Sequence, residues 1–517
     1  MIIKRDRRMI IRCNLPVVSL FLLVLSYGLT VLWASNQGMA VFGFARRLPI
    51  FLYLMLLMQI PSDHRDTAVV LLPFSGTLMV WMALILQYVP GFAGSQLVDG
   101  RLSGFFEYAN TFALFLILCI IVLILQWHSR PALISVIALI TMITGIFFSG
   151  SRIGLFLLLL TLSALILMLR DRHLILQTVF SLLLAILFSY LASELSFIAE
   201  AQRYTTTGTD HGSLWVRFLY YKDAIPQILT HPFGCGWWGY ATTRKLFQHG
   251  VYQVSHVHND LLQLFLDIGW IPTILFAATC IQSFFSHSTS RMAKTMLLLI
   301  CIYSMTEFHL EYLSIWFLLI SCFALQTGHT CVLEVKRLQF PCMIFSLLCA
   351  VSLWLGTGEA SSIAGMPEIS VKITPFYTQA LKKQLRSSDN TSQQRSLAER
   401  ILKYDQYYAL AWTTLADQAW DSNELVLAIQ YQKEAIACDR YNLDIYLSYF
   451  DRLYSMMEYC RASGDNSGEA LCISELTDIP LLLQAVEADT DPLAWEIEHQ
   501  PTLELPEEYQ EKLALLQ

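Results

Sequence analysis

The chain has 517 residues, of which 55% are hydrophobic and only 15% charged, and its net charge is −7. Its mean hydropathy of +0.50 is higher than that of soluble globular proteins, so the composition predicts a polytopic membrane protein. Residues 358–517 carry 26 acidic and 12 basic side chains, a net charge of −14, which leaves +7 on residues 1–357. The acidic tail argues against nucleic-acid binding, whereas a basic membrane part suits anionic phosphates and lipid headgroups.

Apolar segments of about the length that spans a bilayer follow one another up to residue 356. About eleven spans are expected, at 13–34, 48–60, 67–90, 104–126, 131–149, 153–169, 174–192, 261–284, 295–306, 312–326 and 339–356. Five basic residues within 4–12 precede the first span and predict a cytoplasmic N-terminus with a signal anchor. Alternation from there predicts that a long polar loop at about 193–258 and the tail lie outside.

The sequence predicts two domains, a membrane domain at 1–357 and a soluble extracytoplasmic domain at 358–517. The tail reads as helical, and Asp405-Gln-Tyr407 recurs as Asp439-Arg-Tyr441 at the 34-residue period of tetratricopeptide repeats. A tetratricopeptide-like helical-repeat domain is therefore expected, and a generic helical domain is the alternative. Either would be a docking surface rather than a catalytic one. Whether Cys460 and Cys472 form a disulfide is left open by their spacing.

Polar residues near the outer ends of the spans are candidates for function, because polar groups are costly in a bilayer. Glu107 and Asn110 are three residues apart and are expected to share a helix face. Arg152 lies in a very short outer turn, where it either snorkels to the interface or binds an anion. The first outer loop, expected at 35–47, has no acidic residue, which argues against an acidic, metal-binding first loop.

The long loop carries the cations Arg203, Arg217 and Lys222. Residues 214–222 predict a helix lying at the membrane interface, with an aromatic face that includes Tyr221. Arginine binds phosphate oxygens in a bidentate manner, so Arg217 is a candidate phosphate ligand; non-specific headgroup binding is the alternative. The glycines within 232–239 predict a flexible segment that closes over a bulky ligand.

The loop ends at His256-Val-His258, where at least one imidazole, most plausibly that of His258, is expected to act as a general base or to orient a substrate. A purely structural role and metal binding are the alternatives, and a metal would need a third ligand. Asn259, Gln263 and Asp267 follow at helical spacing and predict a polar stripe that faces the bundle interior, serving either substrate or helix–helix hydrogen bonds.

The next outer turn, 307–311, adds two carboxylates and an imidazole. It is either a solvated turn or a further part of the site, and Glu307 is the substrate-binding candidate in it.

These motifs together resemble the bacterial O-antigen ligase and Wzy-type polymerase superfamily, whose members transfer glycans from an undecaprenyl-pyrophosphate carrier. The resemblance covers about 100–270 and rests on the order and spacing of loose motifs. They lie at 105–113, 149–152, 217–224, 231–236 and 256–269. The segment after the histidine helix reads Gly269-Trp-Ile-Pro272, which departs from the family's usual glycine-rich turn. An acidic outer turn of the family is replaced here by the segment that contains Glu307.

The resemblance implies an all-α, GT-C-like membrane bundle followed by the helical-repeat tail. It implies that Arg152 and Arg217 hold the pyrophosphate and that His258 serves the reaction as the third catalytic residue. The expected substrate-binding residues are Glu107, Asn110, Arg203, Tyr221, Lys222, His256, Asn259, Gln263 and Glu307. A metal-independent, inverting transfer without a cofactor is expected, because arginines supply the positive charge and attack comes from the face opposite the leaving group.

The expected partners are the lipid-linked donor, the bilayer, a glycan, lipid or protein acceptor, and an envelope-assembly protein that docks on the tail. The sequence does not distinguish a polymerase from a ligase, because no motif in it identifies the acceptor. A flippase of lipid-linked glycan and a membrane-anchored scaffold are the alternatives outside this enzyme class. Matching internal halves, which a transporter often has, are not seen.

Overall fold

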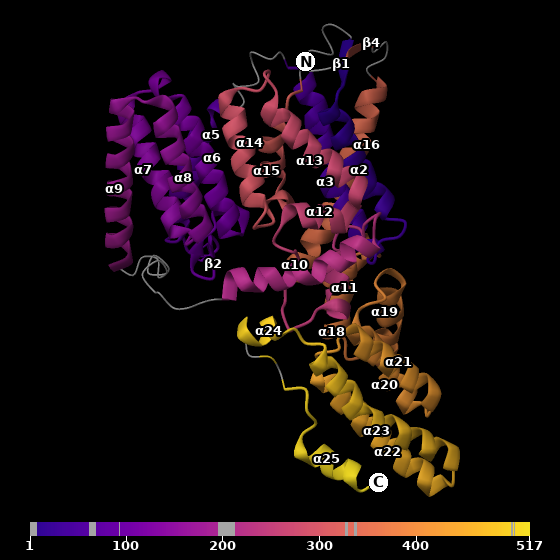
Figure 1. Ribbon diagram of the computed structural model, residues 1–517. Coiled ribbons are helices and arrows are strands. Elements are labelled where there is room, and N and C mark those ends of the chain that lie inside the picture. The colour runs from indigo at the N-terminus through magenta and orange to yellow at the C-terminus, as the bar shows by residue number, and fades with distance from the viewer. Residues whose placement is uncertain are drawn as a thin grey trace.

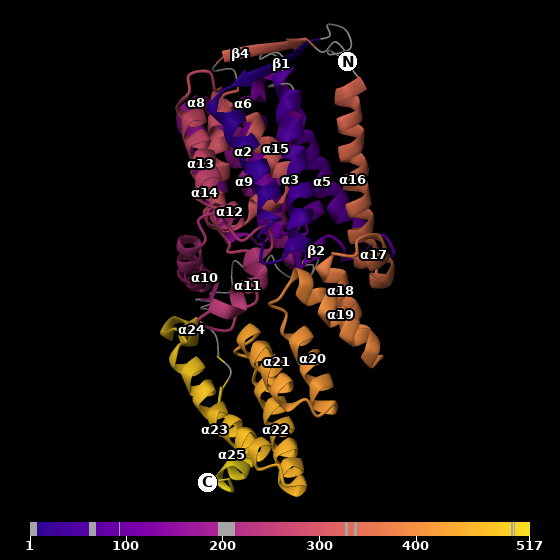
Figure 2. The ribbon, with the colours of Figure 1, turned by 90° about the vertical axis from the view of Figure 1, so that its right-hand side faces the viewer.

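Figure 1 shows a computed structural model of the protein, which describes residues 8–60, 69–92, 94–194, 212–325, 329–334, 339–497, 500 and 502–516. The described chain is almost entirely helical. A bundle fills one end of the molecule and the tail helices fill the other (Figures 1 and 2). The bundle consists of α2 (Leu15–Thr30), α3 (Gln37–Met58), α5 (Leu72–Leu86), α6 (Ala109–Leu125), α7 (Ala132–Phe148), α8 (Arg152–Leu169), α9 (Arg172–Glu194), α12 (Asp260–Ile268), α13 (Trp270–Phe285), α14 (Arg291–Ser304), α15 (Leu313–Ser321) and α16 (Gln339–Ile363).

Short elements connect these helices. The strands are β1 (Arg8–Cys13), which pairs antiparallel with β4 (His329–Glu334) at the end remote from the tail, and β2 (Leu97–Val98), which pairs with β3 (Arg101–Leu102). The 3-10 turns are η1 (Gly104–Phe106), η2 (Trp127–Ser129) and η4 (His309–Glu311).

Every apolar segment of the sequence contains a helix, which confirms the all-helical membrane fold. Within the described residues, four helices are both long and apolar enough to cross a membrane, at Gln37–Met58, Arg152–Leu169, Arg172–Leu191 and Met343–Ile363. Five further apolar helices are shorter, and a helix of 16 residues extends only about 24 Å. The count of about eleven spans therefore stays a prediction.

The expected first outer loop at 35–47 is wrong, because α3 begins at Gln37. Asn36 caps this helix by accepting a hydrogen bond from the backbone N–H of Met39. The charges at Arg46 and Arg47 suggested a loop, but each arginine is paired with a carboxylate from a distant part of the chain. Pairing of this kind allows Arg47 to lie inside a buried helix face with 2% of its side chain exposed.

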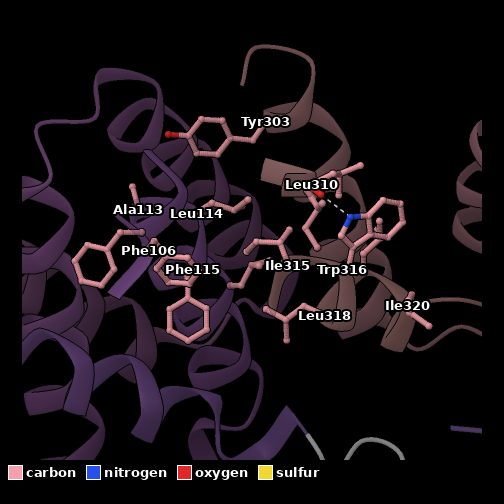
Figure 3. Packing of buried hydrophobic residues seen from close by; sticks show 14 of the residues in the cluster. Phe106, Ala113, Leu114, Phe115, Tyr303, Leu310, Ile315, Trp316, Leu318 and Ile320 are labelled. Carbon is pink, nitrogen blue, oxygen red and sulfur yellow. Dashed lines mark hydrogen bonds between the residues drawn. The ribbon is translucent and has the colours of Figure 1, made fainter. Parts of the chain in front are cut away.

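Helix α6 is the central helix of the bundle. All its residues from Ala109 to Ile124 are buried, which is the pattern expected of a helix that is apolar on every face. Its N-terminal part packs with Phe106 against the α14–α15 region (Figure 3). There Trp316 donates a hydrogen bond to the carbonyl of Leu310 at 2.5 Å and so fixes the turn before α15.

The predicted span at 261–284 is two helices, α12 and α13, separated by Gly269. This glycine has a φ of +83°, and a Cβ there would lie 2.2 Å from the carbonyl oxygen of Pro232. Residues 232–236 pass close to the break, and the N–H of Cys235 donates to the carbonyl of Leu266 at 2.6 Å. Gly234 has a φ of +75° and almost touches the backbone of Asp267. These glycines permit tight backbone packing rather than forming the predicted closing loop.

The long loop predicted at 193–258 contains two helices, α10 (Gly212–Thr230) and α11 (Gly239–Phe247). Helix α10 includes the predicted interfacial helix and lies across the end of the bundle, on the side where the tail begins (Figure 1). Residues 195–211, with the candidate Arg203, lie outside the described residues.

The tail consists of α17 (Pro367–Ile373), α18 (Thr378–Ser387), α19 (Thr391–Tyr404), α20 (Ala409–Asp421), α21 (Leu425–Cys438), α22 (Leu443–Ser463), α23 (Asn466–Ala488), α24 (Pro492–Ile497) and α25 (Glu507–Ala514). Helix α16 continues to Ile363, past the predicted boundary at 357, and the division into two domains stays a prediction. Asp405 and Asp439, at the 34-residue offset, each follow the last residue of a helix. The tetratricopeptide assignment stays a prediction. Cys460 and Cys472 are buried free thiols.

Candidate functional site

The site is centred on Glu307, whose side chain is completely buried in the turn between α14 and α15. One carboxylate oxygen is 2.5 Å from Nη2 of Arg217 and accepts a hydrogen bond from Asn110 at 2.6 Å. The other accepts from the hydroxyl of Tyr108 at 2.5 Å and is 3.2 Å from Nδ1 of His258. A buried carboxylate is costly unless it is paired and fully hydrogen-bonded, and both conditions are met here.

Three separate segments deliver these partners. Asn110 lies in the first turn of α6, Tyr108 immediately precedes that helix, and Arg217 comes from α10. His258 precedes α12 and has a φ of +53°, a left-handed conformation that is uncommon for histidine. Strained backbone of this kind often occurs at functional sites, where the surrounding structure holds it in place.

Asn259 and Tyr221 hold the His258 turn against the Glu307 turn. Asn259 caps α12 by accepting from the N–H groups of Leu261 and Leu262, and it donates to the carbonyl of Met305 at 2.9 Å. Tyr221 donates to the carbonyl of His258 at 2.8 Å. Both were predicted as substrate ligands, and in the structure both have a positioning role.

A second charged cluster surrounds Glu311. This carboxylate pairs with Arg47 at 2.6 Å, accepts from Nε1 of Trp237 at 3.2 Å and lies 3.5 Å from Nε2 of His256. The ring of Phe308 joins the two clusters, because it stacks on His256 with centroids 4.9 Å apart and meets His258 edge-on. The predicted alternative of a solvated turn at 307–311 is wrong, since Glu307 and His309 are both fully buried.

Arg101 and Arg47 belong to the charged network but were missed from the sequence. Arg101 donates to Oδ1 of Asn110 at 2.7 Å and to the carbonyl of Ser149 at 2.8 Å. The signal available was its place just before the 105–113 motif. Arg47 was missed because it was assigned to a loop.

Two residues predicted at the outer ends of the spans are exposed rather than part of the Glu307 cluster. Arg152 is the first residue of α8 and has no hydrogen bond or ion pair to another described residue. Glu107 and Asn110 do not share a helix face, because Glu107 adopts a left-handed conformation in the turn before α6 begins.

Two further candidates have structural partners. Lys222 forms an ion pair with Asp491 of the tail. Gln263 donates to Asp267 at 2.8 Å and accepts from the N–H of Val257 at 3.0 Å, while Asp267 accepts from Tyr27 of α2. Of these bonds, the one from Tyr27 to Asp267 joins two helices, which was one of the two predicted roles, and the Gln263 bonds stay within α12 and the segment before it.

Burial and the neighbouring positive charges shift the pKa of the two carboxylates in the 307–311 turn in opposite directions. Burial alone would raise the pKa of Glu307, but the hydrogen bond from His258 and the charge of Arg217 lower it below its ordinary value. For Glu311, the charge of Arg47 and the contact with His256 outweigh burial and lower the pKa to about 2. Burial lowers the pKa of His309 to about 4. Both carboxylates are therefore ionised and His309 is neutral at pH 7.

Among the described residues, no three histidine, cysteine, aspartate or glutamate side chains are grouped so as to hold a metal ion. The charged network is built from arginines, carboxylates and imidazoles. Such a set can bind an anion and can accept a proton.

The fold and the site define a helical membrane protein. Its buried network of charged side chains, around Glu307 and Glu311, lies where α10 crosses the end of the bundle. A protein-family model described as O-antigen ligase matches residues 137–277, a stretch that includes Arg152, Arg217 and His258. No curated protein and no solved structure matches the chain significantly. The match covers 141 of the 517 residues and is a similarity of that stretch to O-antigen ligases. With the apolar helices, it indicates a multi-pass protein of the inner membrane.

Proposed function

We propose that this protein transfers a glycan from an undecaprenyl-pyrophosphate carrier to an acceptor hydroxyl at the outer face of the cytoplasmic membrane. The observation that carries the proposal is the network around Glu307, which joins His258 to Arg217. His258 and Arg217 lie within the segment that resembles O-antigen ligases, and Glu307 lies outside it. The proposed site thus combines His258 and Arg217 from the matched segment with Glu307 from a turn beyond it.

His258 is arranged to accept a proton. Its Nδ1 faces the ionised Glu307, which favours the tautomer that carries hydrogen on Nδ1 and leaves Nε2 free as a base. No described residue hydrogen-bonds Nε2, and 18% of the side chain is exposed. General-base assistance of this kind contributes typically 10²–10⁴-fold to a rate.

The arginines are arranged to stabilise the leaving group. Arg217 is 13% exposed, so Glu307 holds its guanidinium at the surface of the network, and Arg152 is exposed with no partner among the residues that the structure describes. In the proposed step the acceptor oxygen forms a bond to the anomeric carbon and its proton moves to His258. The bond from that carbon to the pyrophosphate breaks, and the electron pair leaves on the carrier. Attack opposite the leaving group inverts the configuration, and fixed cations stabilise the developing charge.

The acceptor is a further glycan in a polymerase, and a lipid or protein in a ligase. Identifying what accumulates when transfer fails would name the donor, and identifying the product would name the acceptor.

The test is complementation of a deletion strain, with lipid-linked intermediates and surface polysaccharide as readouts. His258→Ala should insert normally and leave carrier-linked glycan at the outer leaflet, and so should Arg217→Ala/Glu307→Gln, which leaves no buried Glu307 charge without its partner. The matched controls are His287→Ala and Arg291→Ala, exposed residues in and just after the turn between α13 and α14. Normal polysaccharide with both site variants would exclude this site. Glycan trapped at the inner leaflet would instead indicate a flippase.

A further inference from the structure

Helix α24 follows α23 after three residues and packs against α10 of the membrane part (Figures 1 and 2). Ala494 of α24 is 1% exposed and belongs to a small apolar core with Leu219 and Ala224 of α10 and Tyr252 of the segment before His258. Leu493 and Ile497 pack against the same core. The tail thus supplies part of the apolar interior that holds α10.

Gly250 shows how closely α24 approaches. A Cβ at Gly250 would lie 2.6 Å from the Cβ of Ala494, a distance that side chains do not adopt without a shift. The backbone of the same segment is bonded to the tail on either side. The N–H of Asp491 donates to the carbonyl of His249 at 2.8 Å, and the N–H of Val251 donates to Oε1 of Gln500 at 2.7 Å.

Charged contacts join the tail to the same two segments. The carboxylate of Asp491, 8% exposed, pairs with Lys222 of α10. Next to Lys222, the fully buried Asp223 accepts from His249 and Tyr252 and so ties α10 to the 249–257 segment. Tail contacts at Asp491 and Ala494 therefore reach α10, which carries Arg217, and the 249–257 segment, which leads directly into His258.

We propose that the tail segment 491–497, through Asp491 and Ala494, is a positioning element of the transfer site, which holds α10 and the 249–257 segment so that Arg217 and His258 meet at Glu307. The consequence for catalysis rests on the proposed function, whereas the consequence for structure does not. Asp491 and Ala494 act through α10 and the 249–257 segment, and neither touches the Glu307 network. The tail therefore positions the residues of the site and is not only a docking surface.

The first test is amide hydrogen exchange on the full-length protein in lipid nanodiscs. Ala494→Leu adds volume against Gly250, and Asp491→Asn removes the charge that pairs with Lys222. Both should speed exchange at least several-fold in 212–230 and 249–257 and leave α6 and α13 unchanged. The matched control is Glu469→Gln, which breaks the pair with Arg461 far from α10. Faster exchange in α24 alone, with α10 unaffected, would overturn the proposal.

The second test separates positioning from a general loss of structure. Lys222→Asp combined with Asp491→Lys restores an attractive pair, so the double variant should recover slower exchange and glycan transfer relative to Lys222→Asp alone. A double variant no better than the single one would contradict the role of this pair. If α24 variants loosen α10 while His258→Ala keeps full transfer, the proposed reaction fails and the positioning role stands.

Discussion

The guanidinium of Arg217 lies 2.5 Å from the carboxylate of Glu307, a residue 90 positions later in the chain. This ion pair joins the cross-lying α10 to the turn between α14 and α15, beside the N-terminus of the central helix α6. Because Glu307 is completely buried, its charge must be balanced by its neighbours. The same carboxylate also faces His258, so one acidic residue sets the position of both a cation and a base.

Glu307→Gln should abolish most transfer while the protein still folds and inserts. The amide has nearly the size of the carboxylate, but it removes the charge that holds Arg217 and that favours the required tautomer of His258. We expect the rate to fall by about 10²–10⁴-fold, the range typical for loss of assisted proton transfer. The measurement is the initial rate of carrier-linked glycan consumption in membranes. Glu475→Gln is the matched control, because it removes a carboxylate in the tail that pairs with Lys433. A Glu307→Gln rate equal to that of the wild type would exclude the charge from the mechanism.

Arg47→Ala should destabilise the bundle strongly, because it leaves the Glu311 carboxylate buried without its main counter-charge. Removing one partner of a buried ion pair typically costs roughly 3–5 kcal/mol. The double variant Arg47→Ala/Glu311→Ala should recover part of that loss, since no uncompensated charge remains. Thermal unfolding in detergent measures both effects. Additive losses in the double variant would show that the two residues do not interact.

Acid should destabilise the protein from about pH 6.5 downward through His309. Burial lowers the pKa of His309 in the folded state to about 4, whereas the ordinary value is 6.5. Between these values the unfolded chain binds a proton that the folded chain does not. The contribution of His309 to the free energy of unfolding is therefore at its highest above pH 6.5. It falls toward pH 4 by up to about 1.4 kcal/mol per pH unit.

His309→Asn should flatten this dependence, because asparagine keeps a polar partner for Thr111, which now bonds Nδ1 at 2.9 Å, and does not titrate. Melting temperatures at several pH values check the slope. His128→Asn is the control, since its side chain is 80% exposed. An unchanged slope in His309→Asn would assign the acid sensitivity to other groups, of which Glu307 is the nearest.

The sequence predicted the helical elements well, because long apolar runs have few other solutions in a membrane. It also named His258, Arg217 and Asn110 as site candidates, since polar residues in apolar surroundings are conspicuous. It failed where a charge is compensated from far away. Arg47 looks like a loop residue until its partner Glu311, 264 positions away, is brought beside it, and Glu307 was a site candidate whose turn could equally have been solvated. It also failed at Gly269, where one residue in a left-handed conformation divides an apparently continuous span.

Arg152→Ala distinguishes anion binding from snorkelling. Because Arg152 is exposed and has no partner among the described residues, its loss should leave the melting temperature unchanged. If it contacts the pyrophosphate, transfer should fall by roughly 10–100-fold, as expected for one lost charge contact of 1.5–3 kcal/mol, and Arg152→Lys should recover part of it. Arg172→Ala, an exposed arginine that begins the next helix, is the control. Full transfer by Arg152→Ala would leave only the snorkelling role, and the cationic part of the site would then rest on Arg217 and Arg101.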